Sequence, residues 1–375
     1  MKKKFPALLL SLALLLSLCA CGGTTDEQAA VGTNDTDERA AVGTGALKVG
    51  FICAGGRDDL SYTYNFVRGR NDASVMLAAE GINVEWLDRW NIDESTCEDA
   101  NRELAEAGCT LIFNNAPGFE ASMLDVAPEY PEVAFVSCTG EASRADALPN
   151  THNASADIDE GRYLAGVVAG LKLQELVDGG ELAPQEAVIG YVGALDCPEV
   201  VSAYTAWYLG ARSVCPTVTM KVQFTGAWSD ADAEQNTAYA LAGMGCRVIS
   251  QHSGNLSPAS AAQDAGVFHT GYNNDMVPVA PRASLVSTRI DWSVYFEHAI
   301  RAVLGGGELE QDWRHGMDVR AVELTPLNRD LIADGTDETL DTLKAALADG
   351  SLQVFAVDGD SPDFALEIDG IEKLN

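Results

Sequence analysis

The sequence has few positively charged residues. It contains 24 Lys and Arg against 56 Asp and Glu, which gives a formal net charge of −32 over 375 residues. A protein that binds nucleic acid needs basic patches to displace the counterions of the phosphate backbone, and anionic lipid head groups attract the same residues. The composition therefore argues against a nucleic-acid partner and against adhesion to an anionic membrane surface. Such a composition is typical of a protein that is kept soluble by charge repulsion between its molecules.

Motifs for metal binding and covalent catalysis are also missing. The five histidines form no H-E-x-x-H pair, and no two of the nine cysteines have C-x-x-C spacing. The sequence has neither a G-x-S-x-G nucleophile elbow nor a G-x-x-x-x-G-K-[ST] phosphate loop. We therefore expect a binding protein with no metal and no cofactor. Apart from Cys19 and Cys21 there are seven cysteines, an odd number, and one or two disulfides among them remain possible.

An apolar run of signal-sequence length lies at the N-terminus. Lys2–Lys4 precede the run Leu8–Leu18, and Leu-Cys-Ala-Cys-Gly follows at residues 18–22. A basic flank, a short apolar run and a small residue before cysteine are typical of an export signal, and the run is too short to span a membrane. We expect residues 1–20 to be a lipoprotein signal peptide and Cys21 to carry the lipid. The protein would then be extracytoplasmic, held at the cell membrane through that lipid alone.

Residues 21–46 form an expected flexible tether. They are rich in Gly, Thr, Asp and Ala and contain no aromatic residue, so they cannot bury enough apolar surface to fold. From Ala46 onward, short apolar runs alternate with segments of helical periodicity, and this rhythm restarts at Val188–Val192. Repeated β-α-β units predict parallel sheets with right-handed crossovers.

Two such runs predict an α/β fold of two doubly wound, Rossmann-like lobes with a hinge. We expect the N-terminal lobe to hold residues 47–157 and 278–308, and the C-terminal lobe residues 158–277 and 309–375. A last strand is expected at 352–355. Ligands in open α/β architectures bind at the carboxyl ends of the strands, so two lobes favour a receptor that closes on a small ligand.

Six segments, in order along the chain, resemble one family. The ordered set resembles the Bmp family of lipoproteins, whose characterised members include a purine nucleoside receptor. The resemblance implies a type I periplasmic-binding fold and the substrate-binding component of an ABC importer, which works with an ABC permease. The segments that carry it are Gly55–Thr63, Glu160–Gly166, Ile189–Gly193, Gly226–Asp230, Gln251–Gly254 and Gly271–Asp275.

The resemblance also implies a site in which two aromatic side chains sandwich a flat base while carboxylates and a lysine hold a ribose. Tyr62 and Trp228 occupy the two aromatic positions. Stacking suits a base because every purine has a π-face. Both residues could instead belong to the core, but each follows a strand end in a loop, which favours a role in the cleft.

The polar positions depart from the family's pattern. Cys53 and Asn273 stand where the family has Asp, Thr139 lies near a third Asp position, and Thr288 replaces the lysine. A Cys or Thr side chain cannot accept two ribose hydroxyls as a carboxylate does. We therefore expect an aromatic, polar and largely uncharged site for a nucleoside, a nucleobase or another flat polar molecule.

Further polar groups complete the expected site. The backbone amides near Gly55 and Gly254 would frame the ligand. Six polar residues either form hydrogen bonds with the ligand or cap loops and face solvent, namely Asp59, Asn65, Asn114, Asn115, Asp196 and His252.

The sequence thus predicts a monomeric, lipid-anchored solute-binding protein without enzymatic activity. The alternative is a surface ligand sensor that signals through a membrane partner and transports nothing. A surface hydrolase acting on nucleosides is disfavoured, because no base, metal or nucleophile cluster supports it.

Overall fold

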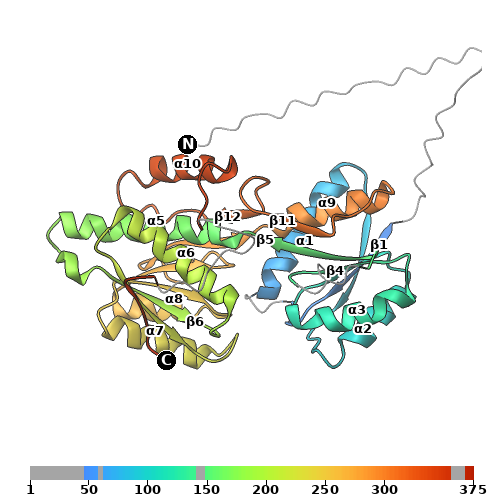
Figure 1. Cartoon of the computed structure of the whole chain (residues 1–375), viewed down its shortest axis with the longest axis horizontal. Coiled ribbons are helices and arrows are strands. Elements are labelled where there is room, and N and C mark those ends of the chain that lie inside the picture. The colour runs from blue at the N-terminus through green and yellow to red at the C-terminus, as the bar shows by residue number, and fades with distance from the viewer. Residues whose placement is uncertain (1–45, 58–61, 141–147, 356–367) are drawn as a thin grey trace, which may run out of the picture. The chain divides into compact units, whose positions relative to one another are not determined.

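The computed structural model describes residues 46–57, 62–140, 148–355 and 368–375. The expected signal peptide, Cys21 and nearly all of the expected tether lie outside these residues, as does Asp59. The segment from Thr44 to Asn375 forms one compact unit, which contains two β-sheets flanked by helices (Figure 1). The α/β fold expected from the alternating pattern is confirmed.

The first sheet is entirely parallel, in the order β11-β5-β4-β3-β1-β2. Alternate strand residues face opposite sides and form two cores. One core is shared with helices α1 and α9, and the other with α2 and α3. The strands are β1 (Leu47–Ile52), β2 (Val84–Arg89), β3 (Leu111–Asn114), β4 (Ala134–Ser137), β5 (Thr151–Ala156) and β11 (Asp312–His315); the helices are α1 (Tyr62–Ala79), α2 (Cys97–Glu106), α3 (Glu120–Val126) and α9 (Trp292–Leu304).

The second sheet has the order β12-β10-β9-β8-β6-β7-β13, and its pairs are parallel except for β10–β12. Figure 1 shows α5 and α6 on one side of this sheet and α7 and α8 on the other. The strands are β6 (Val188–Gly193), β7 (Thr219–Phe224), β8 (Val248–His252), β9 (Phe268–Tyr272), β10 (Ser284–Ile290), β12 (Val322–Leu324) and β13 (Ile371–Lys373); the helices are α5 (Ile158–Asp178), α6 (Pro198–Val214), α7 (Ala231–Gly243), α8 (Ser257–Ala265) and α10 (Thr336–Ala348). Short 3-10 turns occupy Pro117–Phe119, Ala127–Glu129 and Pro184–Glu186.

Helices α5 and α6 approach each other so closely that glycine is required at their contact. A Cβ atom on Gly166 would lie 2.0 Å from the carbonyl oxygen of Trp207, and one on Gly210 would lie 1.9 Å from that of Tyr163. Real Cβ atoms do not come this close to backbone oxygens. The contact therefore fixes the position of α5 against α6.

The chain passes between the sheets three times within the described residues. It leaves the first sheet after β5 to form α5, returns after β10 to form α9, and leaves again between β11 and β12. The sheets thus divide the chain differently from the expected boundaries. β10, which begins at Ser284, belongs to the second sheet because it pairs with β9, and β11 belongs to the first because it pairs with β5.

The prediction of a strand at residues 352–355 is wrong. Leu352 and Val354 are partly buried against the α5–α6 core but pair with no strand. The edge position is taken by β13, which pairs with β7 in parallel.

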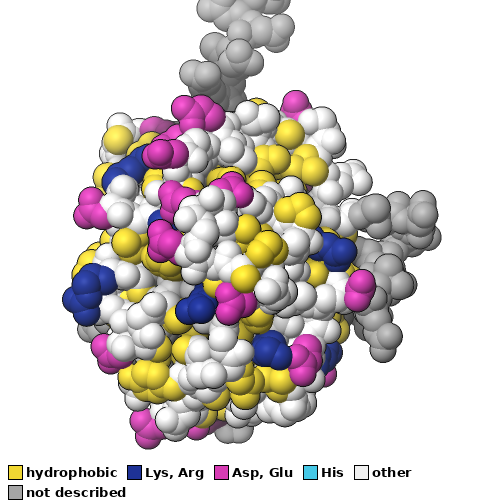
Figure 2. Space-filling view, turned by 90° about the vertical axis from the view of Figure 1, so that its left-hand side faces the viewer, with side chains coloured by type: hydrophobic (Ala, Val, Ile, Leu, Met, Phe, Trp, Pro, Cys, Tyr) yellow, Lys and Arg dark blue, Asp and Glu magenta, His cyan; other side chains and the backbone are white. Residues whose placement is uncertain are grey.

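Charged side chains of both signs lie on the surface. On the face drawn in Figure 2, acidic and basic side chains are interspersed among apolar ones. No helix within the described ranges has the length and apolar character needed to cross a bilayer. The seven cysteines from Cys53 to Cys246 form no disulfide with one another.

Candidate ligand-binding site

Tyr62, the first residue of α1, lies where the first sheet's strands end. Its hydroxyl donates to the carbonyl oxygen of Cys138, directly after β4, at 3.2 Å, and its ring meets that of Phe66 edge-on at 5.0 Å. Burial raises the pKa of Tyr62 well above its usual range, and the nearby Glu199 and Tyr272 raise it further. Glu199 and Tyr272 belong to elements of the second sheet's half. The hydroxyl is therefore neutral and electrostatically coupled to both halves of the fold.

The second sheet supplies a matching cluster at the carboxyl ends of its strands. His252 ends β8 and is 2% exposed; its ring centroid lies 4.6 Å from that of Tyr272 and 6.1 Å from that of Trp228. Glu199 Oε1, in the first turn of α6, lies 3.4 Å from His252 Nε2. We call Glu199, Trp228, His252 and Tyr272 the acceptor cluster.

The charges of this cluster are tuned by burial and by a neighbouring arginine. Burial lowers the pKa of His252, and Arg162 lowers it further, although Glu199 opposes this. Burial acts to raise the pKa of Glu199, but the hydrogen bond from His252 and the charge of Arg162 outweigh it and hold that pKa below its usual value. Near neutral pH the pair is therefore a neutral imidazole beside a carboxylate.

Arg162 lies fully buried on α5, beneath Tyr272. Its guanidinium carbon is 4.0 Å from the centroid of the Tyr272 ring, a cation–π contact, and Nη1 donates to the carbonyl oxygen of Gln251 at 2.9 Å. Nε and Nη2 have no hydrogen-bond partner among the described residues. Neither Arg162 nor Glu199 is among the residues expected in the site from the sequence, and together they place charges of both signs at this cluster.

Unpartnered buried polar atoms gather in the same region. Burying such atoms without partners is costly, so a group of them at one place indicates a binding site or a water site. Within the described residues they include Tyr191 Oη, His252 Nδ1, Thr270 Oγ1 and Asn273 Oδ1.

The expected polar residues from the first sheet's half lie close to Tyr62. Cys53 follows β1 and is fully buried, and together with Cys138 it contributes to the raised pKa of Tyr62. Thr139 is partly buried, and its hydroxyl donates to the carbonyl oxygen of Ala154 on β5 at 3.0 Å.

The expected residues from the second half are held more tightly. Asn273 has a left-handed backbone conformation (φ 63°), which asparagine tolerates. Its backbone N–H donates to the carbonyl oxygen of Thr288 at 2.8 Å. Thr288 is fully buried and its hydroxyl donates to the carbonyl oxygen of Gly161 on α5 at 3.0 Å. Thr288 thus fastens α5 to β10.

The backbone amides expected to frame the ligand have acceptors inside the protein. Gly254 donates to the carbonyl oxygen of Trp228 at 2.8 Å, and Gly55 donates to Thr63 Oγ1 at 3.1 Å. Both bonds stabilise the loops that carry the aromatic residues.

Most of the additional polar candidates also have internal partners. Asn65 donates to Ile290, Asn114 to Asn101, Asn115 to Thr63, and Asp196 accepts from Lys373. Of these candidates, His252 alone joins the acceptor cluster among the described residues.

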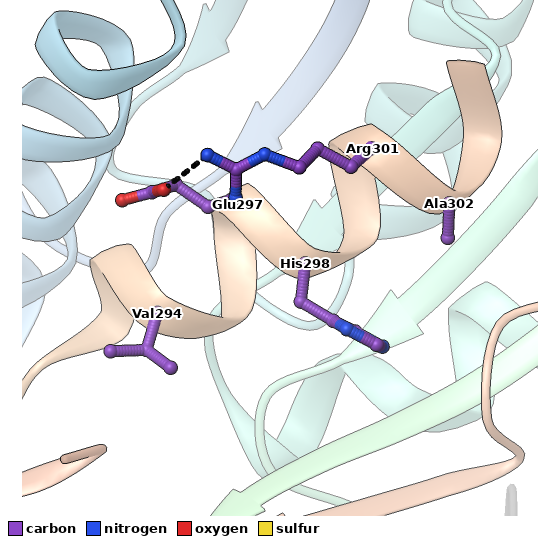
Figure 3. Close-up of a pocket in the computed structure, with 5 residues that line it drawn as sticks. All are labelled: Val294, Glu297, His298, Arg301 and Ala302. Atoms are coloured by element: carbon purple, nitrogen blue, oxygen red, sulfur yellow. Dashed lines mark hydrogen bonds and ion pairs between the residues drawn. The ribbon is translucent and has the colours of Figure 1, made fainter. Parts of the chain in front are cut away.

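Two surface hollows lie elsewhere. The first is formed along the single helix α9 by Val294, His298, Ala302 and the ion pair Glu297–Arg301 at 2.7 Å (Figure 3). The second lies among residues 131–134, 149–152 and 303–311. Neither contains a residue expected in the site, so the site is defined by the contacts of Tyr62 and the acceptor cluster. No group of three or more His, Cys, Asp and Glu in the described ranges is placed to hold a metal ion.

The fold defines a class of protein. This fold resembles that of solved ABC transporter solute-binding proteins. One from Conexibacter woesei matches with a TM-score of 0.65 and 23% identity, covering 82% of this chain and 98% of that chain. One from Aeropyrum pernix matches with a TM-score of 0.67 and 18% identity, covering 85% and 95%. The chain therefore has the periplasmic-binding fold.

The family follows from the sequence match. The model of the Bmp family, described as PnrA-like ABC transporter substrate-binding proteins, matches residues 46–350, and the chain belongs to this family. It is 30% identical to a purine-binding protein of Brucella abortus, over 82% of this chain and 83% of that protein. It is also 30% identical to a putative ABC transporter glucose-binding protein of Haloferax volcanii, over 77% and 72%.

These findings confirm the resemblance. The chain is a substrate-binding protein of an ABC transporter, acts outside the cytoplasm with a small-molecule ligand and a permease, and is not an enzyme.

Proposed function

We propose that this substrate-binding protein captures a purine nucleobase or nucleoside between Tyr62 and Trp228 and delivers it to its permease. The observation that carries the proposal is the placement of Tyr62 at the carboxyl ends of the first sheet's strands and of Trp228, His252 and Tyr272 at those of the second. Aromatic rings from both halves then meet a flat ligand, and its binding energy stabilises the closed arrangement. The purine-binding relative from Brucella abortus supports this ligand class.

The remaining expected site residues have different proposed roles: some line the site and others support it. Cys53 and Thr139 lie beside Tyr62 and line the first half of the site. Asn273 offers its unpartnered Oδ1 from the second half. Gly254 supports the site through its backbone hydrogen bond and Thr288 through its bond to α5. Asp59, which lies outside the described residues, would contact the ligand.

The test is a thermal-shift and calorimetric panel of purine bases, purine nucleosides and monosaccharides, the last prompted by the glucose-binding relative. A ligand at about 100 times its Kd stabilises the folded state by about 2.7 kcal/mol. We expect a saturable shift with at least one purine and none with glucose. A shift with glucose alone would overturn the purine proposal.

We also propose that Cys21 carries the lipid that holds the protein at the membrane as a monomer. The small Ala20 before the cysteine and the tether up to residue 46 support this proposal. The wild-type chain expressed in a bacterial host should label with an alkynyl fatty acid and sediment with membranes, whereas Cys21→Ala should do neither. Cys19→Ala is the matched control and should behave as the wild type. Labelling that persists in Cys21→Ala would contradict the assignment.

A further inference from the structure

The carboxylate of Glu199 is placed to accept hydrogen bonds from a ligand. It lies in the first turn of α6, a 17-residue helix whose N-terminal dipole favours an anion. Its side chain is 50% exposed although its neighbour His252 is 2% exposed. Oε1 faces His252 Nε2, and Oε2 has no donor among the described residues. One carboxylate oxygen is thus occupied within the protein while the other is available.

His252 presents an acceptor as well. A neutral imidazole has one N–H and one acceptor nitrogen. Because Nε2 faces a carboxylate, which only accepts, the proton is on Nε2 and the acceptor is Nδ1, which has no partner within the described part of the chain. Each member of the pair therefore keeps one acceptor atom without a donor. A ligand that satisfies these atoms has to supply N–H groups.

The surroundings favour a flat ligand that is neutral overall. The rings of Trp228 and Tyr272 flank His252, and the guanidinium of Arg162, 4.0 Å from the Tyr272 ring centroid, offsets the charge of Glu199. A ligand with a net charge would disturb this balance. A heterocycle with adjacent N–H donors on one edge would satisfy the acceptors.

We propose that Glu199 and His252 select purines whose N1 position and 2-amino group both donate, as in guanine, over purines whose N1 is an acceptor, as in adenine. This rests on the proposed function and names its ligand more narrowly. An N–H bond to the available Oε2 is charge-assisted and directional, and a second N–H of the ligand can use the remaining lone pair of Oε1, which accepts from His252 through the other. An acceptor nitrogen facing the same carboxylate would leave it unpaired, and sites built for a hydrogen bond reject such analogues strongly.

The experiment is isothermal titration of the full folded chain with guanosine, 1-methylguanosine and adenosine. Methylation removes the N1 donor but leaves the ring and the ribose unchanged. We expect guanosine to bind at least tenfold more tightly than either of the other two. Glu199→Gln should weaken the binding of guanosine at least tenfold. It should leave the affinity for adenosine unchanged or higher, because the Gln amide donates to an acceptor N1.

Glu338→Gln is the matched control. Glu338 is an exposed acid in the first turn of α10, so this variant removes one negative charge from a helix start outside the site. It should bind all three ligands as the wild type does. Far-UV circular dichroism confirms that each variant is folded, and the wild-type ligand series stands even if a variant fails.

The outcomes separate the two proposals. The proposed selection of N1-donating purines is overturned if the wild type binds guanosine, 1-methylguanosine and adenosine with equal affinity, or if Glu199→Gln leaves the affinity for guanosine unchanged. The purine function stands in both cases. If neither these ligands nor other purines bind the wild type, the purine function itself is overturned.

Discussion

Replacing Gly210 by alanine should destabilise the protein and weaken its ligand binding. The new Cβ would lie 1.9 Å from the carbonyl oxygen of Tyr163, whereas an ordinary contact begins at 3.4 Å. Relief therefore requires α5 and α6 to separate by about 1.5 Å. Neither atom belongs to a flexible side chain, so no rotamer change can absorb the clash.

The cost can be bounded from the same contact. Overpacking a core costs about 1–3 kcal/mol and occasionally more. A gap of about 0.5–1 Å already forfeits a quarter to a half of the dispersion energy of the atoms that line it, and this separation is larger. The gain in helix propensity from Gly to Ala returns only about 1 kcal/mol. We expect a net loss of at least about 2 kcal/mol, with weaker ligand binding because Arg162 precedes Tyr163.

The assay is urea unfolding followed by far-UV circular dichroism, with Gly243→Ala as the control. Gly243 ends α7, has no positive φ, and a Cβ atom there would meet nothing within 4 Å. Gly243→Ala should therefore raise the free energy of unfolding by up to about 1 kcal/mol. We expect the two substitutions to change the free energy of unfolding in opposite directions. Equal effects, or a Gly210→Ala variant as stable as the wild type, would refute the close helix contact.

Three further predictions concern the site and the crossing into α5. Trp228→Ala should weaken ligand binding by about 1–3 kcal/mol, measured by calorimetry against Met244→Ala, another exposed apolar residue of the same half; equal affinities would remove Trp228 from the site. Tyr62→Phe should bind within about threefold of the wild type and Tyr62→Ala at least tenfold more weakly, since the ring and not the hydroxyl meets the ligand. Burial raises the pKa of Glu160 to about 7, so the folded state holds this proton more tightly than the unfolded chain and loses that stability as pH rises from about 5 to 8. Glu160→Gln should flatten the fall in the urea midpoint over this range, and an unchanged slope would contradict the assignment.

The sequence predicts those elements whose hydrophobic pattern agrees with their final environment. β1 and β6 are apolar runs and are buried in the sheets as expected. β5, with the sequence Thr-His-Asn-Ala-Ser-Ala, is equally buried but largely polar, and its asparagine is satisfied by Asp312 on β11. A strand held by such distant partners has no local signal, because residues 159 positions apart supply its hydrogen bonds.

The same limit applies to the site. Tyr62 and Trp228 were predicted from the resemblance, whereas His252 was one of several polar residues expected either to bind the ligand or to cap a loop. Arg162 lies inside the quoted Glu160–Gly166 segment, but only the fold shows that its guanidinium meets Tyr272, 110 residues later in the sequence. Glu199 follows a proline at a helix start, which alone gives no reason to expect a ligand.

The threefold passage of the chain between the sheets sets the order in which the protein is completed during synthesis. The aromatic core of the first half depends on Phe296, whose ring centroid lies 4.7 Å from that of Phe113 and 5.9 Å from that of Phe51. Yet α9 is made only after β6 to β10 of the second half. A nascent chain that ends before residue 292 holds five strands of the first sheet, and the aromatic face of that sheet is covered by α1 but not yet by α9. The amino-terminal half is therefore completed only when α9 and β11 emerge, after most of the second half has been made, and β12, α10 and β13 then complete the second half.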